Sequence, residues 1–323
     1  MNGKNHVYAH LAGTGGQASC EIAGGHIQKQ GWLPLASFIS LFVGIIAFLL
    51  ISSVTSKDFH SKNEVKKYTL YSKLQWDWAL SSLESYHFNG NESVLDLGCG
   101  EGKITAELAR RVPAGRVIGL DISPAMINFA SSRYPRSEYR NLLFMQADAT
   151  KNPFNEQFDL IVSSCALHFI EDQKTVVAGI KQALSLGGRA LLVMPEAYPY
   201  NLSPVSERLA QSERWQPYFE QLNVPLRYYK SAYEYEQIVK EAGFKVLSIK
   251  SIPIDDQFKN RDTLVEWILT ISSFAKALPQ ELQRQFAEEA ADGMLTECPP
   301  PCVDGTVILR SPKLEVWVMK NEP

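Results

Sequence analysis

Apolar and polar positions alternate in blocks along the chain from Lys66 onward. Short continuous apolar runs are separated by longer stretches in which apolar residues recur every three or four positions. The first pattern is typical of buried strands and the second of amphipathic helices. Strands that alternate with helices in this way indicate a parallel sheet with helices on both faces. We therefore predict an α/β protein over this part of the chain.

The same pattern predicts the individual elements. Strands are expected at 94–97, 116–120, 142–146, 158–163, 189–194, 245–252, 306–310 and 313–319. Helices are expected at 76–83, where one covers the site, and at 103–112, 124–132, 174–186, 233–242, 261–276 and 280–294. Residues 196–230 break the rhythm and are rich in aromatic side chains. We expect them to form a helical and aromatic cap together with residues 261–300.

The N-terminal part of the chain has a different composition. Residues 1–32 are rich in glycine and polar residues without periodicity, which predicts disorder. Residues 33–54 lie in an uncharged stretch between Lys29 and Lys57, long enough for the roughly 20 residues that a transmembrane helix needs. More lysines follow this segment than precede it, which places the body of the chain in the cytoplasm. Two alternatives stay open: a cleaved signal peptide, or a misassigned start of translation that would leave a cytoplasmic protein.

The amino-acid composition says little more about the fold or the partners of the chain. A chain of 323 residues, 45% of them hydrophobic, can bury the core of one large domain or two small ones. A net charge of −3 gives no indication of a nucleic-acid partner. The five cysteines are odd in number and scattered, unlike a disulfide framework. Cys298 and Cys302 flank three prolines in what we interpret as a stiff loop, and no metal site is expected because no other Cys or His lies close by.

The candidate chemistry begins directly after the first predicted strand. Gly98, Gly100 and Gly102 form a Gly-x-Gly-x-Gly turn before a helix, which lets the backbone approach a ligand closely. A dinucleotide-binding turn would have glycine or alanine one residue later, where this chain has Lys103. The second strand ends in Asp121, nineteen residues past Gly102. A carboxylate there can accept hydrogen bonds from two vicinal ribose hydroxyls, although a helix-capping or turn acid is the alternative.

These motifs resemble those of class I methyltransferases that use S-adenosylmethionine, and the resemblance runs from about Tyr68 to the C-terminus. It implies a doubly wound, mostly parallel, seven-stranded Rossmann-like sheet with an antiparallel C-terminal strand. In this chain the predicted transmembrane helix precedes that fold. The resemblance also implies S-adenosylmethionine as the cofactor.

The resemblance assigns roles to several residues at the strand ends. It implies that Asp96 helps to hold the methionine ammonium group and that Asp121 binds the ribose. Asp148 is matched to the acid that accepts a hydrogen bond from the adenine amino group, although it could instead cap the next turn. The other cofactor-binding candidates, on the predicted lid helix, in the glycine turn and at the strand ends, are Tyr71, Gln75, Gly98, Cys99, Gly100, Ile122, Met126, Ala149, Ser163 and Ser164.

The segment 163–169, after the fourth strand, is expected to border the methyl acceptor. It lacks the Asn/Asp-Pro-Pro-Tyr motif usual in methyltransferases that act on adenine or glutamine amides, and no Pro-Cys nucleophile of the cytosine-C5 enzymes appears. Methyl transfer mainly requires proximity, alignment and a pocket with little water. A carboxylate acceptor is already ionised at pH 7, whereas an amine or hydroxyl must lose a proton. His168 is the one evident candidate for a catalytic base, although a packed or cofactor-contacting histidine is the alternative.

The C-terminal region resembles one particular group of these methyltransferases. Residues 264–267 and 304–314 resemble trans-aconitate methyltransferases, which esterify one carboxylate of a small polyacid; juvenile-hormone-acid and malonyl-carrier-protein O-methyltransferases are broader relatives. Such a pocket needs arginine, and Arg310 is the candidate, with a surface ion pair as the alternative. We therefore expect O-methylation of a small carboxylic acid such as trans-aconitate. An acyl-carrier thioester, lipid or amine acceptor, or a non-catalytic module that binds S-adenosylmethionine, are the alternatives.

Overall fold

The computed structural model describes residues 65–66, 68–69, 72–296, 298 and 302–321. The predicted disordered segment 1–32, the predicted transmembrane helix 33–54 and Tyr71 lie outside these residues. Within the described part of the chain, no helix is long and apolar enough to cross a membrane. The transmembrane helix therefore stays a prediction from the sequence.

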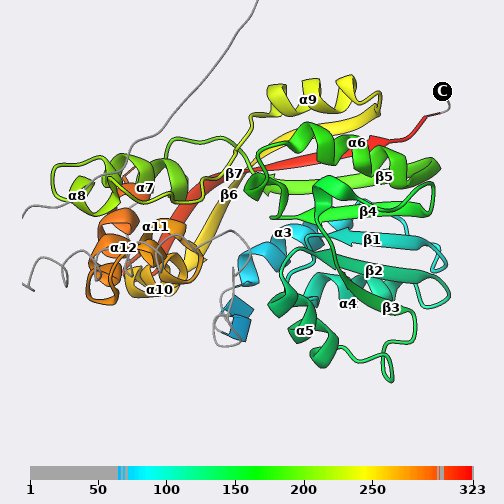
Figure 1. Ribbon diagram of the computed structural model, residues 1–323, viewed down its shortest axis with the longest axis horizontal. Helices are drawn as coiled ribbons and strands as arrows, with labels where there is room; N and C mark the ends of the chain where they lie inside the picture. The colour runs from blue at the N-terminus through cyan, green and yellow to red at the C-terminus, as the bar shows by residue number, and fades with distance from the viewer. Residues whose placement is uncertain (1–64, 67, 70–71, 297, 299–301, 322–323) are drawn as a thin grey trace, which may run out of the picture. The chain divides into compact units, whose positions relative to one another are not determined.

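The described part of the chain is built on a seven-stranded sheet (Figure 1). Its strands are β1 (Ser93–Leu97), β2 (Arg116–Asp121), β3 (Leu142–Gln146), β4 (Phe158–Ser164), β5 (Leu184–Pro195), β6 (Lys245–Phe258) and β7 (Val307–Met319). They lie in the order β3-β2-β1-β4-β5-β7-β6; the pairs from β3 to β5 are parallel, and β7 runs antiparallel to both β5 and β6. The expected mostly parallel sheet with an antiparallel C-terminal strand is confirmed.

The two strands predicted at 306–310 and 313–319 are a single strand, β7. Ser311 and Pro312 suggested a break, yet pairing with β6 continues through them, with Pro312 opposite Pro253. Because two opposed prolines remove the N–H donors of one residue pair only, the ladder continues on either side. The predicted helix 261–276 is instead divided at Ser272, whose side chain accepts the N–H of Ala275 and begins a new helix.

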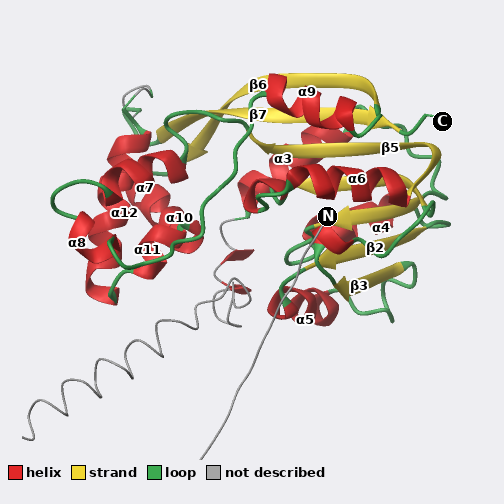
Figure 2. Ribbon diagram, turned by 45° about the horizontal axis from the view of Figure 1, so that its top comes forward, coloured by secondary structure: helices red, strands yellow, loops and turns green. Residues whose placement is uncertain are grey.

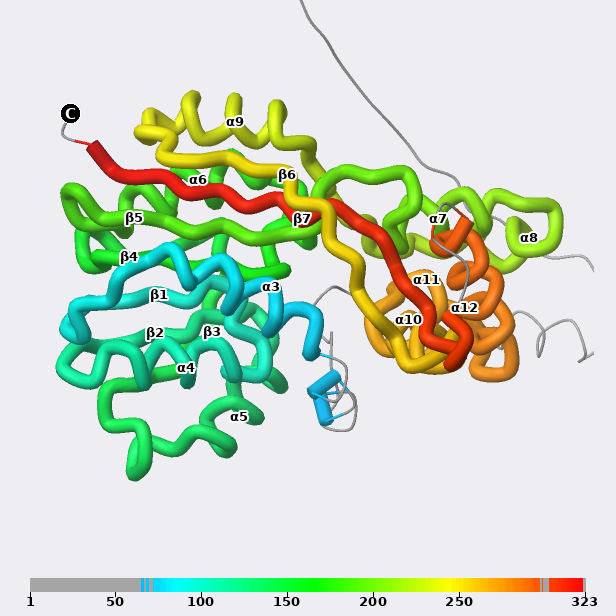
Figure 3. The backbone as a smooth tube through the Cα atoms, turned by 180° about the vertical axis from the view of Figure 1, so that it is seen from behind, coloured from blue at the N-terminus to red at the C-terminus, as the bar shows by residue number. Residues whose placement is uncertain are grey.

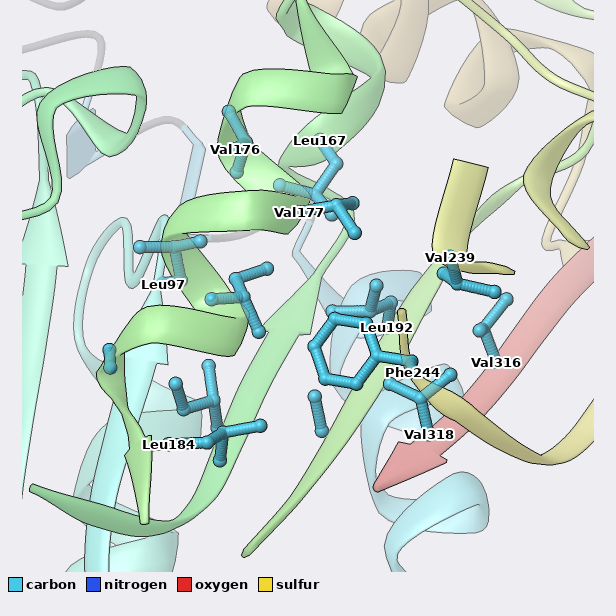
Figure 4. Close-up of a cluster of buried hydrophobic side chains, with 14 of the residues drawn as sticks. Leu97, Leu167, Val176, Val177, Leu184, Leu192, Val239, Phe244, Val316 and Val318 are labelled. Atoms are coloured by element: carbon cyan, nitrogen blue, oxygen red, sulfur yellow. The ribbon is translucent and has the colours of Figure 1, made fainter. Parts of the chain in front are cut away.

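Helices cover both faces of the sheet. One face packs against α6 (Gln173–Ala183) and α9 (Ala232–Glu241) through the apolar cluster shown in Figure 4. The other face packs against α3 (Lys73–Leu83) and α4 (Lys103–Arg111), while α5 (Pro124–Arg133) contacts β2 and β3. The chain order reverses between the neighbours β1 and β4, and in such sheets ligands bind at the carboxyl ends of the strands beside that point.

A helical cap is built on the far ends of β6 and β7, which extend beyond the other strands (Figures 2 and 3). The cap contains α7 (Leu202–Ala210), α8 (Gln216–Phe219), α10 (Arg261–Ile271), α11 (Ser273–Ala277) and α12 (Gln280–Met294). Trp267, Met294 and Leu309 belong to an apolar cluster that joins α10, α12 and β7. The cap thus has a core of its own, next to the carboxyl ends of β4 and β5.

Candidate active site

The glycine turn after β1 has the left-handed backbone that its sequence predicts. Gly98, Gly100 and Gly102 have φ of 79°, 53° and 81°. A Cβ on Gly98 would lie 2.2 Å from the Cβ of Ala166, so this position is glycine for packing reasons. A Cβ on Gly100 would meet no heavy atom within 4 Å. Gly100 therefore leaves open space in front of the turn, where a ligand can approach the backbone.

Asp121, at the end of β2, is held by two backbone donors. One carboxylate oxygen accepts the N–H of Gly100 at 2.9 Å and the other accepts that of Ser123 at 2.8 Å. Burial raises the pKa of Asp121, whereas these two hydrogen bonds lower it. Each carboxylate oxygen can accept a second hydrogen bond. The carboxylate is thus oriented in advance, with capacity for two ligand hydroxyls.

Asp96 lies behind the glycine turn. It is 1% exposed and accepts a 2.7 Å hydrogen bond from the Thr105 hydroxyl of α4. Burial raises its pKa to about 7, and the hydrogen bond from Thr105 offsets part of that shift. Asp96 joins β1 to α4 and lies outside the lining of the cleft described next.

A cleft of about 500 Å³ opens in front of the glycine turn. Ten of the predicted cofactor-binding residues line it: Gln75, Gly98, Cys99, Gly100, Asp121, Ile122, Met126, Asp148, Ala149 and Ser164. Ser163 does not, because its hydroxyl points to the Leu97 carbonyl, which it reaches at 2.8 Å. The sequence pattern therefore identified most of one wall, formed by the ends of β1 to β4.

Asp148 has two roles available. Its Oδ1 accepts the backbone N–H and the hydroxyl of Thr150, at 2.9 and 2.8 Å, and so caps the short 3₁₀ helix η1 (Ala149–Lys151). The side chain also borders the cleft. Both hydrogen bonds end on Oδ1, so capping does not prevent Oδ2 from meeting a ligand.

Residues 225–228 form a second part of the lining, which the sequence did not predict. The N–H of Tyr228 donates to the His168 carbonyl at 2.7 Å, and the Gln173 side chain donates to the Tyr228 carbonyl at 2.7 Å. The guanidinium of Arg227 lies 3.8 Å from the ring centre of Phe169. An arginine followed by two tyrosines in the aromatic segment was the only sequence signal for this part of the lining.

A second, smaller cavity of about 100 Å³ adjoins the cleft and extends under the cap. Five residues line both spaces: Tyr68, Gln75, Cys165, Phe169 and Arg227. Burial lowers the pKa of Arg227 to about 10, so the side chain still carries its charge at pH 7. The two spaces thus meet beside a cation.

His168 lies in the 3₁₀ helix η2 (Leu167–Phe169), is buried and lines the smaller cavity. Its ring stacks on Tyr229 with centroids 5.6 Å apart. Burial, together with the charge of Arg227, holds the pKa of His168 well below its usual range. The imidazole is therefore neutral at pH 7 and a weak base.

Cys165 lines both spaces and has a strained backbone for a non-glycine residue, with φ of 52°. Its N–H donates to the Val193 carbonyl at 2.8 Å, which fixes the end of β4 against β5. Burial raises the pKa of its thiol to about 12, so the thiol is protonated at pH 7. Such backbone strain is common at functional sites.

Arg310 lies elsewhere. Its guanidinium makes two 2.8 Å hydrogen bonds to the carboxylate of Asp255, across the β6–β7 pair. The Arg310 side chain is 48% exposed, and it lines neither the cleft nor the smaller cavity. Its position corresponds to the surface ion pair and argues against the predicted carboxylate-binding role.

A family model described as a methyltransferase domain matches residues 88–250, half of the chain. The chain belongs to this methyltransferase family. The match contains the glycine turn, Asp121, Asp148 and the residues shared by the two spaces, apart from Tyr68 and Gln75.

The chain is also similar to individual known proteins, in sequence or in fold. Trans-aconitate 2-methyltransferase of Escherichia coli O1:K1 / APEC is 28% identical over 233 residues, which cover 72% of this chain and 87% of that protein. The solved YcgJ protein of Bacillus subtilis superposes with a TM-score of 0.53 at 19% identity, over 77% of this chain and all of that one. Phosphoethanolamine N-methyltransferase 2 of Haemonchus contortus, solved with S-adenosyl-L-methionine, gives 0.56 at 19% identity, over 84% of this chain and 61% of that one. The two structures share the fold.

The cleft fits S-adenosylmethionine, the cofactor that the resemblance implies. Asp121 matches the ribose hydroxyls, and Ile122 and Met126 offer apolar surface for adenine. Glu101 also lines the cleft, and its Oε2 is buried without a hydrogen-bond partner among the described residues, as a site for an ammonium group would be. Four carboxylates and two cations line the cleft in all, an excess that favours a ligand with a net positive charge.

Proposed function

We propose that this chain transfers a methyl group from S-adenosylmethionine to the carboxylate of a small acid. The observation that supports this most directly is the place of Arg227, which borders both the cofactor cleft and the smaller cavity. Arginine is the side chain best suited to bind a carboxylate through two parallel hydrogen bonds. A carboxylate bound there lies at the junction of the two spaces, where the acceptor must meet the cofactor.

The protonation states of the side chains where the two spaces meet are consistent with an acceptor that needs no catalytic base. S-adenosylmethionine, when bound, supplies an electrophilic methyl group on a sulfonium. Cys165 is protonated at pH 7, burial also raises the pKa of Tyr68, and His168 is a weak base. A carboxylate is ionised at pH 7 without help. In this proposal Arg227 orients the carboxylate and the surrounding side chains exclude water.

Labelled cofactor provides the test. The full-length chain is incubated with methyl-labelled S-adenosylmethionine and a panel of carboxylic acids, and the product is then treated with alkali. Methyl esters hydrolyse and release labelled methanol, whereas N-methyl groups do not. We expect alkali-labile label in the presence of an acid. Alkali-stable product, or transfer only to amines, would exclude the carboxylate as acceptor.

We also propose, from sequence alone, that residues 33–54 anchor the chain in a membrane with the methyltransferase domain in the cytoplasm. The support is the uncharged stretch of spanning length and the lysines that follow it. Membrane fractionation of the full-length chain and of a chain that lacks residues 1–55 tests this. A full-length chain found in the soluble fraction, or a later N-terminus found by sequencing, would contradict it.

A further inference from the structure

Most of the surface that lines the smaller cavity is apolar, and polar side chains, Asn201, Ser203 and Ser273 among them, contribute the rest. Its walls come from α3, from the cap and from β7, and they include Leu74, Trp78, Leu202, Trp267, Ile271 and Leu309. Removing the apolar surface of a ligand from water against apolar walls is favourable in free energy. A polar group placed against the same walls loses its hydrogen bonds to water, which is unfavourable. The part of the acceptor that enters the cavity therefore matches this lining when it is apolar.

Arg227 is the one permanently charged side chain among the described residues that line the cavity. His168, the other ionisable cation there, is neutral at pH 7. One N–H of Arg227 donates to the Ile271 carbonyl at 3.2 Å, and the guanidinium carbon lies 3.8 Å from the ring centre of Phe169. This fixes the side chain at the boundary with the cofactor cleft. One cation at this boundary matches one carboxylate, and further carboxylates deeper in the cavity would be buried without a counter-charge.

The size of the cavity sets a second limit. Its volume of about 100 Å³ is somewhat smaller than the roughly 150 Å³ of an engineered apolar cavity that binds one benzene molecule. A body of about one aromatic ring, or a short branched chain, fits after small side-chain adjustments. A long acyl chain does not fit inside it.

We propose that the acceptor is a monocarboxylic acid with a compact apolar body, held with its carboxylate on Arg227 and its body under the cap. This inference rests on the proposed function. In the transfer, a carboxylate oxygen forms a bond to the methyl carbon as the carbon–sulfur bond breaks. The electron pair of that bond stays on sulfur, and no proton moves. The polyacid trans-aconitate, the substrate named for the E. coli relative, does not match this cavity.

A panel of acids tests the proposal with the full-length chain. Phenylacetate, benzoate and isovalerate represent compact apolar monoacids, trans-aconitate and citrate represent polyacids, and palmitate represents long chains. We expect kcat/KM to be at least about tenfold higher for the best compact acid than for any polyacid or for palmitate. Calorimetry with S-adenosylhomocysteine present should give the same order for binding.

The outcomes separate the two proposals. Preference for a polyacid or for palmitate would overturn the compact apolar acceptor while leaving carboxylate methylation intact. If no acid in the panel binds or is methylated, carboxylate methylation itself fails, and with it the inference. Preference for a compact apolar acid supports both.

A matched pair of variants tests the cavity itself. Ile271→Ala removes side-chain volume from the wall, and we expect the ratio of kcat/KM for octanoate to that for isovalerate to rise about tenfold. Ile249→Ala removes the same atoms from a half-buried position on β6 that lines neither space, and the ratio should not change. An unchanged ratio in Ile271→Ala would show that the acceptor body does not occupy this cavity. If Ile271→Ala fails to fold, Ile271→Val provides a smaller change in the same direction.

Discussion

The backbone N–H of Gly100 donates to the carboxylate of Asp121 at 2.9 Å, so the turn after β1 and the end of β2 form one unit. The eighteen residues between Gly102 and Asp121 contain α4, a short loop and most of β2, and they return the chain to the same edge of the sheet. The Asp121 carboxylate is oriented before any ligand binds. Such preorganisation lowers the cost of ordering the site when the cofactor arrives.

Asp121→Asn tests the ribose contact. The substitution keeps the shape of the side chain but removes the charge and one acceptor oxygen. Hydrogen bonds to a charged acceptor contribute about 1.5–3 kcal/mol each, so the affinity for S-adenosylmethionine should fall at least about tenfold. Calorimetry measures this, with Asp304→Asn, a turn acid outside the cleft, as the control. An unchanged affinity would remove Asp121 from the site.

Two glycine variants separate packing from ligand approach. Gly98→Ala should destabilise the fold by about 2–4 kcal/mol, because the new methyl overlaps the Cβ of Ala166 and φ is positive. Gly100→Ala should destabilise it by only about 1 kcal/mol, yet should weaken cofactor binding severely, because its methyl enters open space in the cleft. Denaturant unfolding and calorimetry measure the two effects. Normal cofactor affinity in a folded Gly100→Ala variant would contradict the cleft assignment.

The buried acid Asp96 should make stability depend on pH. Its pKa is about 7 in the folded chain, against about 3.9 in an unfolded one. The folded state therefore binds the proton more tightly, and the free energy of unfolding should fall as the pH rises from about 4 to 7, by a few kcal/mol at most. Asp96→Asn, which keeps an acceptor for Thr105, should reduce this slope. Equal slopes in the two proteins, measured by urea unfolding at each pH, would show that Asp96 is not desolvated.

Arg227→Lys and Arg310→Lys distinguish the two candidate anchors for the acceptor. Lysine keeps the charge but loses the planar pair of donors, so Arg227→Lys should raise the KM of the acid about tenfold or more. The same change at Arg310, whose guanidinium binds Asp255 at the surface, should leave that KM within about twofold. Steady-state kinetics with saturating cofactor give both values. The reverse pattern would restore Arg310 as the carboxylate-binding residue.

The sequence predicted features whose causes are local. A glycine turn between a buried strand and a helix, followed by an acid at the end of the next strand, determines one wall of the cleft without knowledge of distant residues. Arg227 was missed because its role depends on how residues 225–228 cross the segment after β4, through hydrogen bonds to His168 and Gln173.

Arg310 shows the converse. Its residue type suited the predicted role, but the β6–β7 register places it opposite Asp255, and that register cannot be read from a single strand. Strand β7 is unbroken for the same reason. Its partner strand β6 has a proline opposite Pro312, and the two strands stay paired through this position. The pairing of β7 with β6 therefore determines both the position of Arg310 and the continuity of β7.

The dependence of kcat on pH tests the central claim, methylation of a carboxylate without a base, most directly. The full-length chain is saturated with S-adenosylmethionine and with the best acid of the panel, and kcat is measured from pH 6 to 9. A carboxylate with a pKa of about 4 is fully ionised throughout, so we predict a flat profile. A rate that rises by about tenfold per pH unit over part of this range would show that the acceptor must lose a proton. His168 would then become the candidate base, and the carboxylate proposal would be wrong.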